Sequence, residues 1–185
     1  MTPPAEQPLV VLIGPPGAGK STIGKRLAAK TGAQYLDLDQ HIERAAGKKI
    51  ADIFAQHGEA HFRQLESEAL AHMLARGGLV LALGGGTPVK EANQRELARY
   101  AANRGIIVFL DVSIDTAVKR LGESNTDRPL LAGDTRAKLT SLLEQRRPIY
   151  EAVATLQLDT STQTPAQIAA RLVDHLEDKK VNGAA

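Results

Sequence analysis

Short apolar runs alternate along the chain with longer stretches in which apolar residues recur every three or four positions. Residues 9–13 are continuously apolar, which is typical of a strand that helices cover on both faces. Further strands are predicted at residues 35–38, 79–83, 106–110 and 155–158. Helical spacing is found at residues 21–30, 50–56, 59–75, 90–101, 115–121, 135–145 and 165–178. This alternation of strand and helix predicts parallel βαβ units, and therefore an α/β fold.

A polar segment at residues 122–134 interrupts the alternation. It is too irregular for a helix or a strand and too long for a tight connection. Segments of this kind often close over a binding site, so we expect a mobile lid there.

The composition fits a single globular domain over residues 1–185. With 43% hydrophobic and 24% charged residues, the chain can build one ordinary core. The 23 Lys and Arg residues nearly balance the 21 Asp and Glu residues, and aromatic residues make up only 3%. The charge excess and the aromatic platform that serve nucleic-acid binding are therefore both missing.

Membrane and secretory features are also missing from the sequence. No apolar run approaches the roughly 18 residues of a membrane span, and residues 1–7 do not resemble a secretory signal. The chain has no cysteine, which excludes a disulfide framework, a thiolate zinc site and a cysteine nucleophile. We therefore expect a cytoplasmic protein with no nucleic-acid or membrane partner.

The most specific motif lies between the first strand and the helix that follows it. Residues 14–21 match the pattern G-x-x-x-x-G-K-[ST] in that context. Glycines let successive backbone N–H groups wrap a phosphate at the positive end of a helix. Lys20 would supply charge to the outer phosphates, and the Ser21 hydroxyl would bind Mg²⁺. The alternative is a glycine-rich turn with an incidental lysine.

The motif therefore predicts a nucleoside triphosphate with Mg²⁺, held by Gly17, Ala18, Gly19, Lys20, Ser21 and Thr22. It does not separate a kinase from a switch or a motor. Asp111, at the end of the fourth predicted strand, is a candidate to support the Mg²⁺, but no glycine-bearing switch follows it. The chain also leaves no room for a second large domain. A small-molecule phosphotransferase is therefore the leading class.

A second pocket is expected beside the triphosphate, because ligands gather at the carboxyl ends of parallel strands. Asp37 and Asp39 end the second predicted strand, and three glycines, residues 84–86, end the third. Side chains alternate along a strand, so both carboxylates would point to one side. A carboxylate there can orient or deprotonate a hydroxyl, or hold a magnesium water. The alternative is that Asp39 caps a helix at residues 40–45.

Three arginines stand out by their settings: Arg63, Arg128 and Arg146. Each of them alone is more often a solvated surface charge. Three consecutive glycines at a strand end are costly in backbone entropy, and close approach to a ligand would justify them.

With these residues the chain closely resembles the shikimate kinase family, within the nucleoside-monophosphate-kinase-like P-loop group. The resemblance rests on motifs at residues 14–24, 36–39, 50–54, 58–66, 84–86, 128–131 and 146–150. It implies ATP-dependent phosphorylation of the 3-hydroxyl of shikimate. It also implies a three-layer αβα fold with five parallel strands in the order 2-3-1-4-5, and an acceptor-binding helical region at about residues 39–75.

The resemblance also implies roles for individual residues. Lys20, Asp39 and Arg128 would be catalytic: Asp39 would orient or deprotonate the attacking hydroxyl, and Arg128 would reach from the lid to the transferring phosphate. Asp37 would hold the metal through water. The remaining positions implied are Arg63 and Arg146 at the acceptor carboxylate, Gly84, Gly85 and Gly86 along the ring, and Arg120 and Gln163 at the nucleotide.

Two other functions remain open on the sequence. The same fold could serve a kinase for another small hydroxy acid such as gluconate, or a non-catalytic ATP-binding module. Retention of Lys20, Ser21, Asp39 and the three arginines argues against a module that only binds. We expect a monomer with shikimate as its small-molecule substrate.

Overall fold

A five-stranded, all-parallel sheet forms the centre of the molecule, in the order β2-β3-β1-β4-β5. The computed structural model describes residues 10–123 and 135–182. The strands are β1 (Val10–Ile13), β2 (Gln34–Asp37), β3 (Leu79–Ala82), β4 (Ile107–Asp111) and β5 (Leu156–Asp159). The expected fold class and strand order are confirmed.

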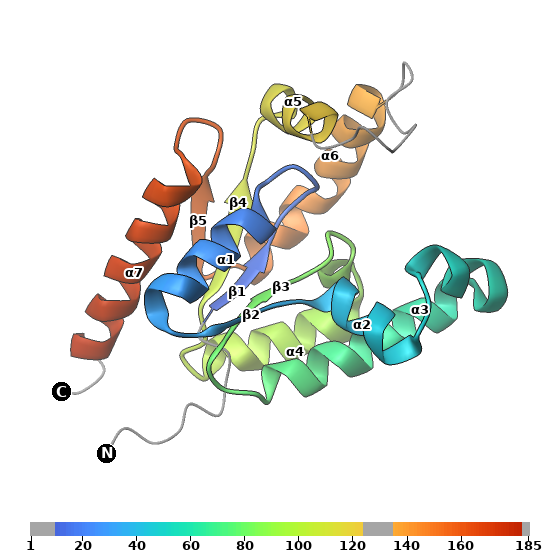
Figure 1. Cartoon of the computed structure of the whole chain (residues 1–185), viewed down its shortest axis with the longest axis horizontal. Helices are drawn as coiled ribbons and strands as arrows, with labels where there is room; N and C mark the ends of the chain where they lie inside the picture. The colour runs from blue at the N-terminus through green and yellow to red at the C-terminus, as the bar shows by residue number, and fades with distance from the viewer. Residues whose placement is uncertain (1–9, 124–134, 183–185) are drawn as a thin grey trace.

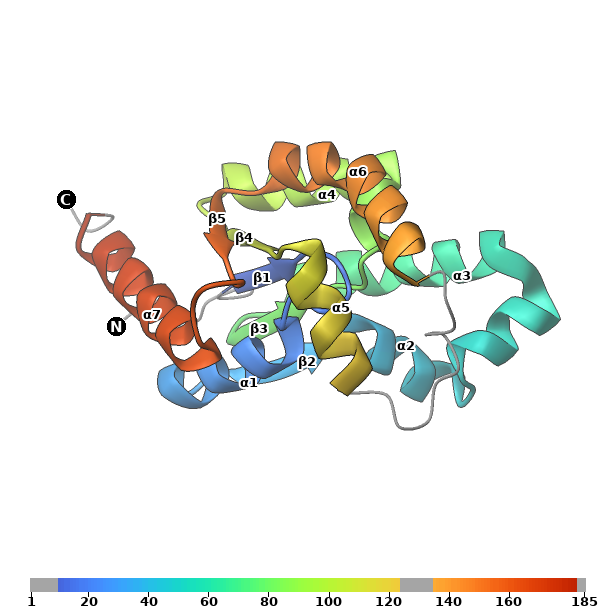
Figure 2. The ribbon, with the colours of Figure 1, turned by 90° about the horizontal axis from the view of Figure 1, so that it is seen from above.

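Helices cover both faces of this sheet (Figures 1 and 2). They are α1 (Lys20–Thr31), α2 (Leu38–Ala46), α3 (Ile50–Leu74), α4 (Glu91–Ala102), α5 (Ile114–Glu123), α6 (Thr135–Val153) and α7 (Pro165–Asn182), with a 3₁₀ turn η1 (Thr87–Val89). Figure 2 shows α4 and α6 on one side of the sheet and α1 on the other, where α1 packs against α7. The layers are those of an αβα sandwich.

The strand sequence explains this double cover. In β1 all four residues are buried, and they alternate between two apolar clusters. Val11 and Ile13 join the cluster that includes Phe62 of α3, whereas Val10 and Leu12 join the cluster of α1 and α7. A strand buried on both faces has no polar position to offer, which is why its sequence is a continuous apolar run.

Glycine at position 58 shapes the long helix α3. The two helices predicted at residues 50–56 and 59–75 run on as one bent element, with non-helical angles at Gly58 (φ 81°, ψ 170°). Residues with a side chain strongly disfavour this region, so the bend is possible because position 58 is glycine. Figure 1 shows the bent α3 beside α2, projecting away from both termini.

The junction of β2 and α2 differs from the prediction. The strand ends at Asp37, and α2 begins at Leu38, so Asp39 lies in the first turn of a helix. The Asp37 side chain accepts a hydrogen bond from the Gln40 N–H at 3.1 Å and caps α2. The strand alternation predicted for Asp37 and Asp39 is therefore wrong, and so is the alternative that Asp39 is the cap.

The helices at the C-terminal end are longer than predicted. Helix α6 continues to Val153 across Pro148, so Arg146 lies within the helix and not after it. Helix α7 continues to Asn182. Gly122 and Glu123 belong to α5, while residues 124–134, the rest of the predicted lid, lie outside the described residues. Within the part of the chain described, no helix combines the length and apolar character needed to cross a membrane.

Candidate active site

The carboxyl ends of β1, β2 and β3 open onto one cleft of about 1730 Å³. The phosphate loop lines one wall, and Asp37 and Asp39 line another, together with Gly84 and Gly85. Parallel strands bring their carboxyl ends to the same edge of the sheet, which is why segments distant in sequence meet here. The cleft therefore brings the phosphate loop together with Asp39, Gly84 and Gly85 of the predicted acceptor residues. Arg63, Gly86 and Arg146 do not line it.

The phosphate loop depends on its glycines. Gly14, Gly17 and Gly19 have φ values of 146°, 81° and 88°, which disfavour any side chain. A Cβ on Gly14 would lie 2.5 Å from the Leu110 carbonyl oxygen, and one on Gly17 would lie 2.9 Å from the backbone of Ala117. The loop therefore keeps its backbone N–H groups open to a phosphate only with glycine at these positions.

Lys20 is the first residue of α1 and bends back over the loop. Its Nζ donates to the Gly14 carbonyl at 2.7 Å and to the Pro15 carbonyl at 3.0 Å. Burial lowers the pKa of Lys20 to about 8, and the carboxylates of Asp37 and Asp39 partly oppose that change. An anionic ligand in the loop would favour the charged amine for the same electrostatic reason.

Oxygen donors suited to Mg²⁺ stand next to the loop. Ser21 and Thr22 line the cleft from the first turn of α1, and Asp37 lines it from the end of β2. Hydroxyl and carboxylate oxygens, completed by water and phosphate, are the ligands that Mg²⁺ prefers in nucleotide sites. Ser21 and Asp37 therefore fit the predicted metal position.

Asp39 is a half-buried carboxylate with one oxygen that lacks a partner. Its Oδ1 is buried and accepts no hydrogen bond from any of the described residues. Burial raises the pKa of Asp39 to about 6; the charges of Asp37 and Glu66 add to the effect, and Lys20 and Arg63 oppose it. An unsatisfied buried oxygen is costly, so its place on the cleft wall marks it as an acceptor for a hydroxyl group of a ligand.

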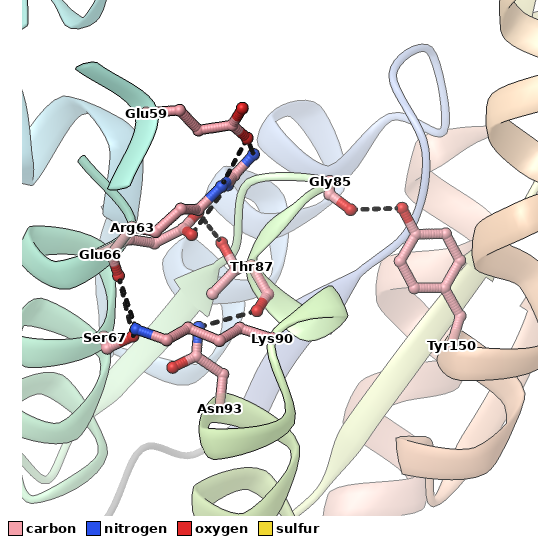
Figure 3. Close-up of polar contacts among 9 residues, drawn as sticks. All are labelled: Glu59, Arg63, Glu66, Ser67, Gly85, Thr87, Lys90, Asn93 and Tyr150. Atoms are coloured by element: carbon pink, nitrogen blue, oxygen red, sulfur yellow. Dashed lines mark hydrogen bonds and ion pairs between the residues drawn. The ribbon is translucent and has the colours of Figure 1, made fainter. Parts of the chain in front are cut away.

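Arg63 lies beside the triple-glycine turn, held by two carboxylates of its own helix (Figure 3). Its guanidinium donates to Glu66 at 2.9 Å and to Glu59 at 3.3 Å. A Cβ on Gly86 would lie only 2.8 Å from Nη1 of Arg63. The glycine therefore allows the guanidinium to come against the backbone of the turn.

Arg146 approaches the same turn from α6. Its Nη1 lies 3.4 Å from the position of a Cβ on Gly85. One helical turn later, the Tyr150 hydroxyl donates to the Gly85 carbonyl at 2.6 Å (Figure 3). Two guanidinium groups from different helices thus border one glycine turn, an arrangement that suits a carboxylate.

Arg120 lies on the nucleotide side of the cleft, in α5. It donates to the Gly17 carbonyl at 3.1 Å and to the Thr160 hydroxyl at 3.1 Å. Gln163 lies nearby, and both residues line a small cavity of about 90 Å³ that also includes Gly19 and Thr22. The two predicted nucleotide contacts are therefore close together. Arg128 lies outside the described residues.

Comparison with known proteins agrees with this geometry. The model of the shikimate kinase family matches residues 16–177. The chain belongs to the shikimate kinase family. A shikimate kinase of Thermobifida fusca is 45% identical over 172 residues, which cover 93% of this chain and 96% of that protein.

Solved structures of the shikimate kinase family have the same fold. A shikimate kinase of Acinetobacter baumannii, solved in complex with shikimate, is 33% identical with a TM-score of 0.81, covering 92% of this chain and 93% of that one. A gluconokinase of Sinorhizobium meliloti has a TM-score of 0.63 at 20% identity, with 96% of each chain covered, and shows the fold alone.

Behind the acceptor wall of this shikimate kinase family member lie polar residues for which the sequence predicted no role. Glu66 is 1% exposed and accepts from the Thr87 hydroxyl at 2.7 Å as well as from Arg63. Buried Asn93 donates to the Thr87 carbonyl at 2.8 Å (Figure 3). The three-residue spacing of Arg63 and Glu66 on a helix could have indicated their pairing. Nothing in the sequence marks Thr87 or Asn93.

Proposed function

We propose that this protein transfers the γ-phosphoryl group of ATP to the 3-hydroxyl of shikimate, giving shikimate 3-phosphate and ADP. The observation that carries the proposal is the partnerless Asp39 oxygen on the cleft wall opposite the phosphate loop, beside a glycine turn bordered by Arg63 and Arg146. Membership of the shikimate kinase family and the relative solved with shikimate support the choice of acceptor.

The phosphate loop and its flanking residues bind the nucleotide in this proposal. Residues 17–22 hold the phosphates through backbone N–H groups and Lys20, whose amine leaves the loop carbonyls when phosphate arrives. Ser21 would ligate Mg²⁺, and Asp37 would hold it through water. Bound Mg²⁺ neutralises charge on the phosphates during transfer. Arg120 would lie against the base, and Gln163 would contact the nucleotide.

The acceptor residues orient shikimate for attack. Arg63 and Arg146 would grip its carboxylate, and Gly84, Gly85 and Gly86 would line the ring. Asp39 would hold the ring hydroxyls and orient or deprotonate the attacking one. The oxygen of that hydroxyl would form the new bond to the γ-phosphorus as the bond from this phosphorus to the bridging oxygen breaks, and ADP would leave. The raised pKa of Asp39, about 6, is close to that of a useful general base.

The remaining roles rest on the family resemblance. Arg128 would meet the transferring phosphate, residues 122–134 would act as the lid, and residues 39–75 would form the acceptor-binding region within the single domain. We also expect a cytoplasmic monomer with no nucleic-acid or membrane partner, which light scattering and cell fractionation can test.

A coupled ADP-release assay with Mg-ATP tests the proposal. It compares shikimate, gluconate, quinate and no acceptor on the wild type, on Lys20→Ala, and on Lys30→Ala, an exposed lysine of the same helix. We expect shikimate-dependent turnover in the wild type and in Lys30→Ala, and none in Lys20→Ala. Turnover only with gluconate or quinate would replace the acceptor, and ATP binding without any turnover would favour a binding module.

Arg63→Lys tests the acceptor side separately. A lysine cannot reproduce a bidentate contact with a carboxylate, so we expect the KM for shikimate to rise, or kcat to fall, by about tenfold or more. Kinetics equal to those of the wild type would remove Arg63 from the acceptor site.

A further inference from the structure

An ion pair between Arg147 of α6 and Asp111 of β4 has no role in the proposed phosphoryl transfer. Arg147 follows Arg146 directly, and its Nη1 and Nη2 donate to the two carboxylate oxygens of Asp111, each at 2.7 Å. The side chains are 36% and 20% exposed, respectively. A bidentate pair of this length and burial is geometrically specific, unlike an ordinary surface pair.

The sheet holds the Asp111 end of the pair firmly. The Asp111 carboxylate also accepts the Val112 N–H at 2.8 Å and the Gln157 amide at 3.2 Å. Its backbone carbonyl accepts the Thr160 N–H at 2.9 Å. Asp111 does not line the cleft. Its oxygens are therefore used to fix a guanidinium, not to support the Mg²⁺ as its position in the sequence suggested.

Helix α6 lacks one backbone hydrogen bond near this ion pair, so contacts from outside the helix matter there. Pro148 lies within the helix and has no N–H to donate to the carbonyl of Glu144. Tyr150 anchors the helix on one side of Pro148, through Gly85. Arg147 anchors it on the other side, through β4. The proposed carboxylate ligand, Arg146, directly precedes Arg147, at the N-terminal end of this anchored stretch.

The side chains of neighbouring helical residues point about 100° apart, so Arg146 and Arg147 contact different parts of the protein. The Arg147 guanidinium lies 5.8 Å from the ring centroid of Phe109 on β4, within the range of a cation–π contact. Arg146 instead faces Gly85. Arg147 therefore cannot replace Arg146 as a ligand without giving up Asp111.

We propose that Arg147 and Asp111 form a positioning pair, which fixes the place of Arg146 on α6 and so sets how well the acceptor carboxylate is gripped. Arg147 contacts neither ATP nor shikimate and acts through Arg146. The inference rests on the proposed function of Arg146. It predicts that breaking the pair harms the use of the carboxylate-bearing substrate and leaves the nucleotide side intact.

The first test is the kinetics of Arg147→Ala. We expect the KM for shikimate to rise about tenfold, with the KM for ATP within about twofold of the wild-type value. Arg99→Ala is the matched control, because it breaks the exposed Arg99–Glu96 pair on α4, and both KM values should stay unchanged. A parallel rise of both KM values in Arg147→Ala would mean a general structural role and would overturn the inference.

The decisive test is a double-mutant cycle with Arg146→Ala. If Arg147 acts through Arg146, then adding Arg147→Ala to Arg146→Ala should change the KM for shikimate by less than about twofold. A tenfold effect that persists without Arg146 would overturn the inference. Should Arg147→Ala fold poorly, Arg147→Lys and Asp111→Asn retain more of the contact, and a selective, smaller rise in the shikimate KM is expected from each.

Failure of the inference and failure of the proposed function give different results. A wild-type enzyme that phosphorylates shikimate, an Arg146→Ala variant with a raised shikimate KM and an Arg147→Ala variant with normal kinetics would overturn only the positioning pair. A wild-type enzyme that does not use shikimate would overturn both.

Discussion

At the scale of single residues, Asp39 is retained at a cost to folding. Its carboxylate is half-buried and lies near Asp37 and Glu66, and its buried Oδ1 finds no donor among residues 10–123 and 135–182. Folding alone would favour a neutral group at this position. A cleft that must hold and activate a hydroxyl requires the carboxylate instead, and this conflict is characteristic of functional sites.

The conflict predicts a pH-dependent stability difference for Asp39→Asn. The pKa of Asp39 is raised from 3.8 to about 6 in the folded protein. The ionised form is therefore disfavoured by folding: its cost is absent below about pH 4 and complete above about pH 6. At pH 8 the variant should exceed the wild type by about 1–2 kcal/mol in the free energy of unfolding, and the difference should shrink at pH 5.

Urea denaturation at both pH values measures this difference. Asp174→Asn is the control, because that carboxylate is exposed on α7 and keeps its hydration on folding; its stability should follow that of the wild type. A wild type that is more stable than Asp39→Asn at pH 8 would contradict the prediction. Turnover of Asp39→Asn should also fall about 100-fold or more, without loss of ATP affinity.

The triple-glycine turn gives a graded prediction, also at the residue scale. A Cβ at position 84 would lie 2.8 Å from Oδ1 of Asp39, and one at position 86 would lie 2.8 Å from Nη1 of Arg63, whereas one at position 85 first meets Arg146 at 3.4 Å. The nearest atoms are ends of flexible side chains, and none of the three glycines has a positive φ. Alanine should therefore be tolerated by the fold but displace the acceptor residues.

We expect Gly84→Ala and Gly86→Ala to raise the KM for shikimate about tenfold or more, and Gly85→Ala to have a smaller effect. ATP affinity and the thermal midpoint should change little in all three. Steady-state kinetics with isothermal titration of ATP measures both sides. Equal effects at the three positions would show that the turn does not act through Asp39 and Arg63.

At the scale of elements, the sequence predicts the positions of strands and helices best where a single local pattern is present and no other pattern competes with it. The apolar run of β1, the glycine loop and α1 follow one another without conflict, and all were predicted at the observed places. At residues 35–39 two signals compete: the alternation of Leu36, Asp37 and Leu38 is typical of a strand, while Leu38 and Ile42 share a helical face. The capping bond of Asp37 decides for the helix.

Helix α6 shows a second limit of the sequence. Pro148 normally ends a helix, so a boundary near residue 145 was the reasonable prediction. The helix continues because its side chains are held from outside, by β4 through Arg147 and by the glycine turn through Tyr150. Tertiary contacts of this kind leave no local pattern, and neither do Thr87 and Asn93 behind the acceptor wall.

Tyr150→Phe tests the contact between α6 and the glycine turn. The change removes a partly buried hydrogen bond of 2.6 Å and leaves the Gly85 carbonyl without its donor. We expect the free energy of unfolding to fall by about 1–3 kcal/mol. We also expect the KM for shikimate to rise, because the hydrogen bond that fixes α6, and with it Arg146, to the glycine turn is lost.

Tyr100→Phe is the matched control for that experiment. The Tyr100 hydroxyl accepts the Ile106 N–H at 3.3 Å, ahead of β4 and so at the opposite edge of the sheet from the cleft. Urea denaturation should show a loss of stability in both variants. A raised KM for shikimate in both would mean that lost stability alone weakens binding.

At the scale of the whole molecule, the nucleotide side and the acceptor side of the cleft are built from different elements around the sheet. The nucleotide side is built from the loop after β1, from α1 and α5, and from the segment after β5. The acceptor side is built from α2 and α3, from the turn after β3, and from α6. The two sides meet at Lys20, Asp37 and Asp39, where the phosphoryl group would move.

This division predicts that the two ligands stabilise the protein through separable sets of residues. A ligand at about 100 times its Kd adds about 2.7 kcal/mol, which for a chain of this size raises Tm by roughly 5–10 °C. Mg-ADP and shikimate should each do so in the wild type. Lys20→Ala should lose the rise with Mg-ADP and keep the rise with shikimate, and Arg63→Ala should do the reverse. Differential scanning calorimetry measures all six cases, and loss of both rises in either variant would mean that the cleft responds as one unit.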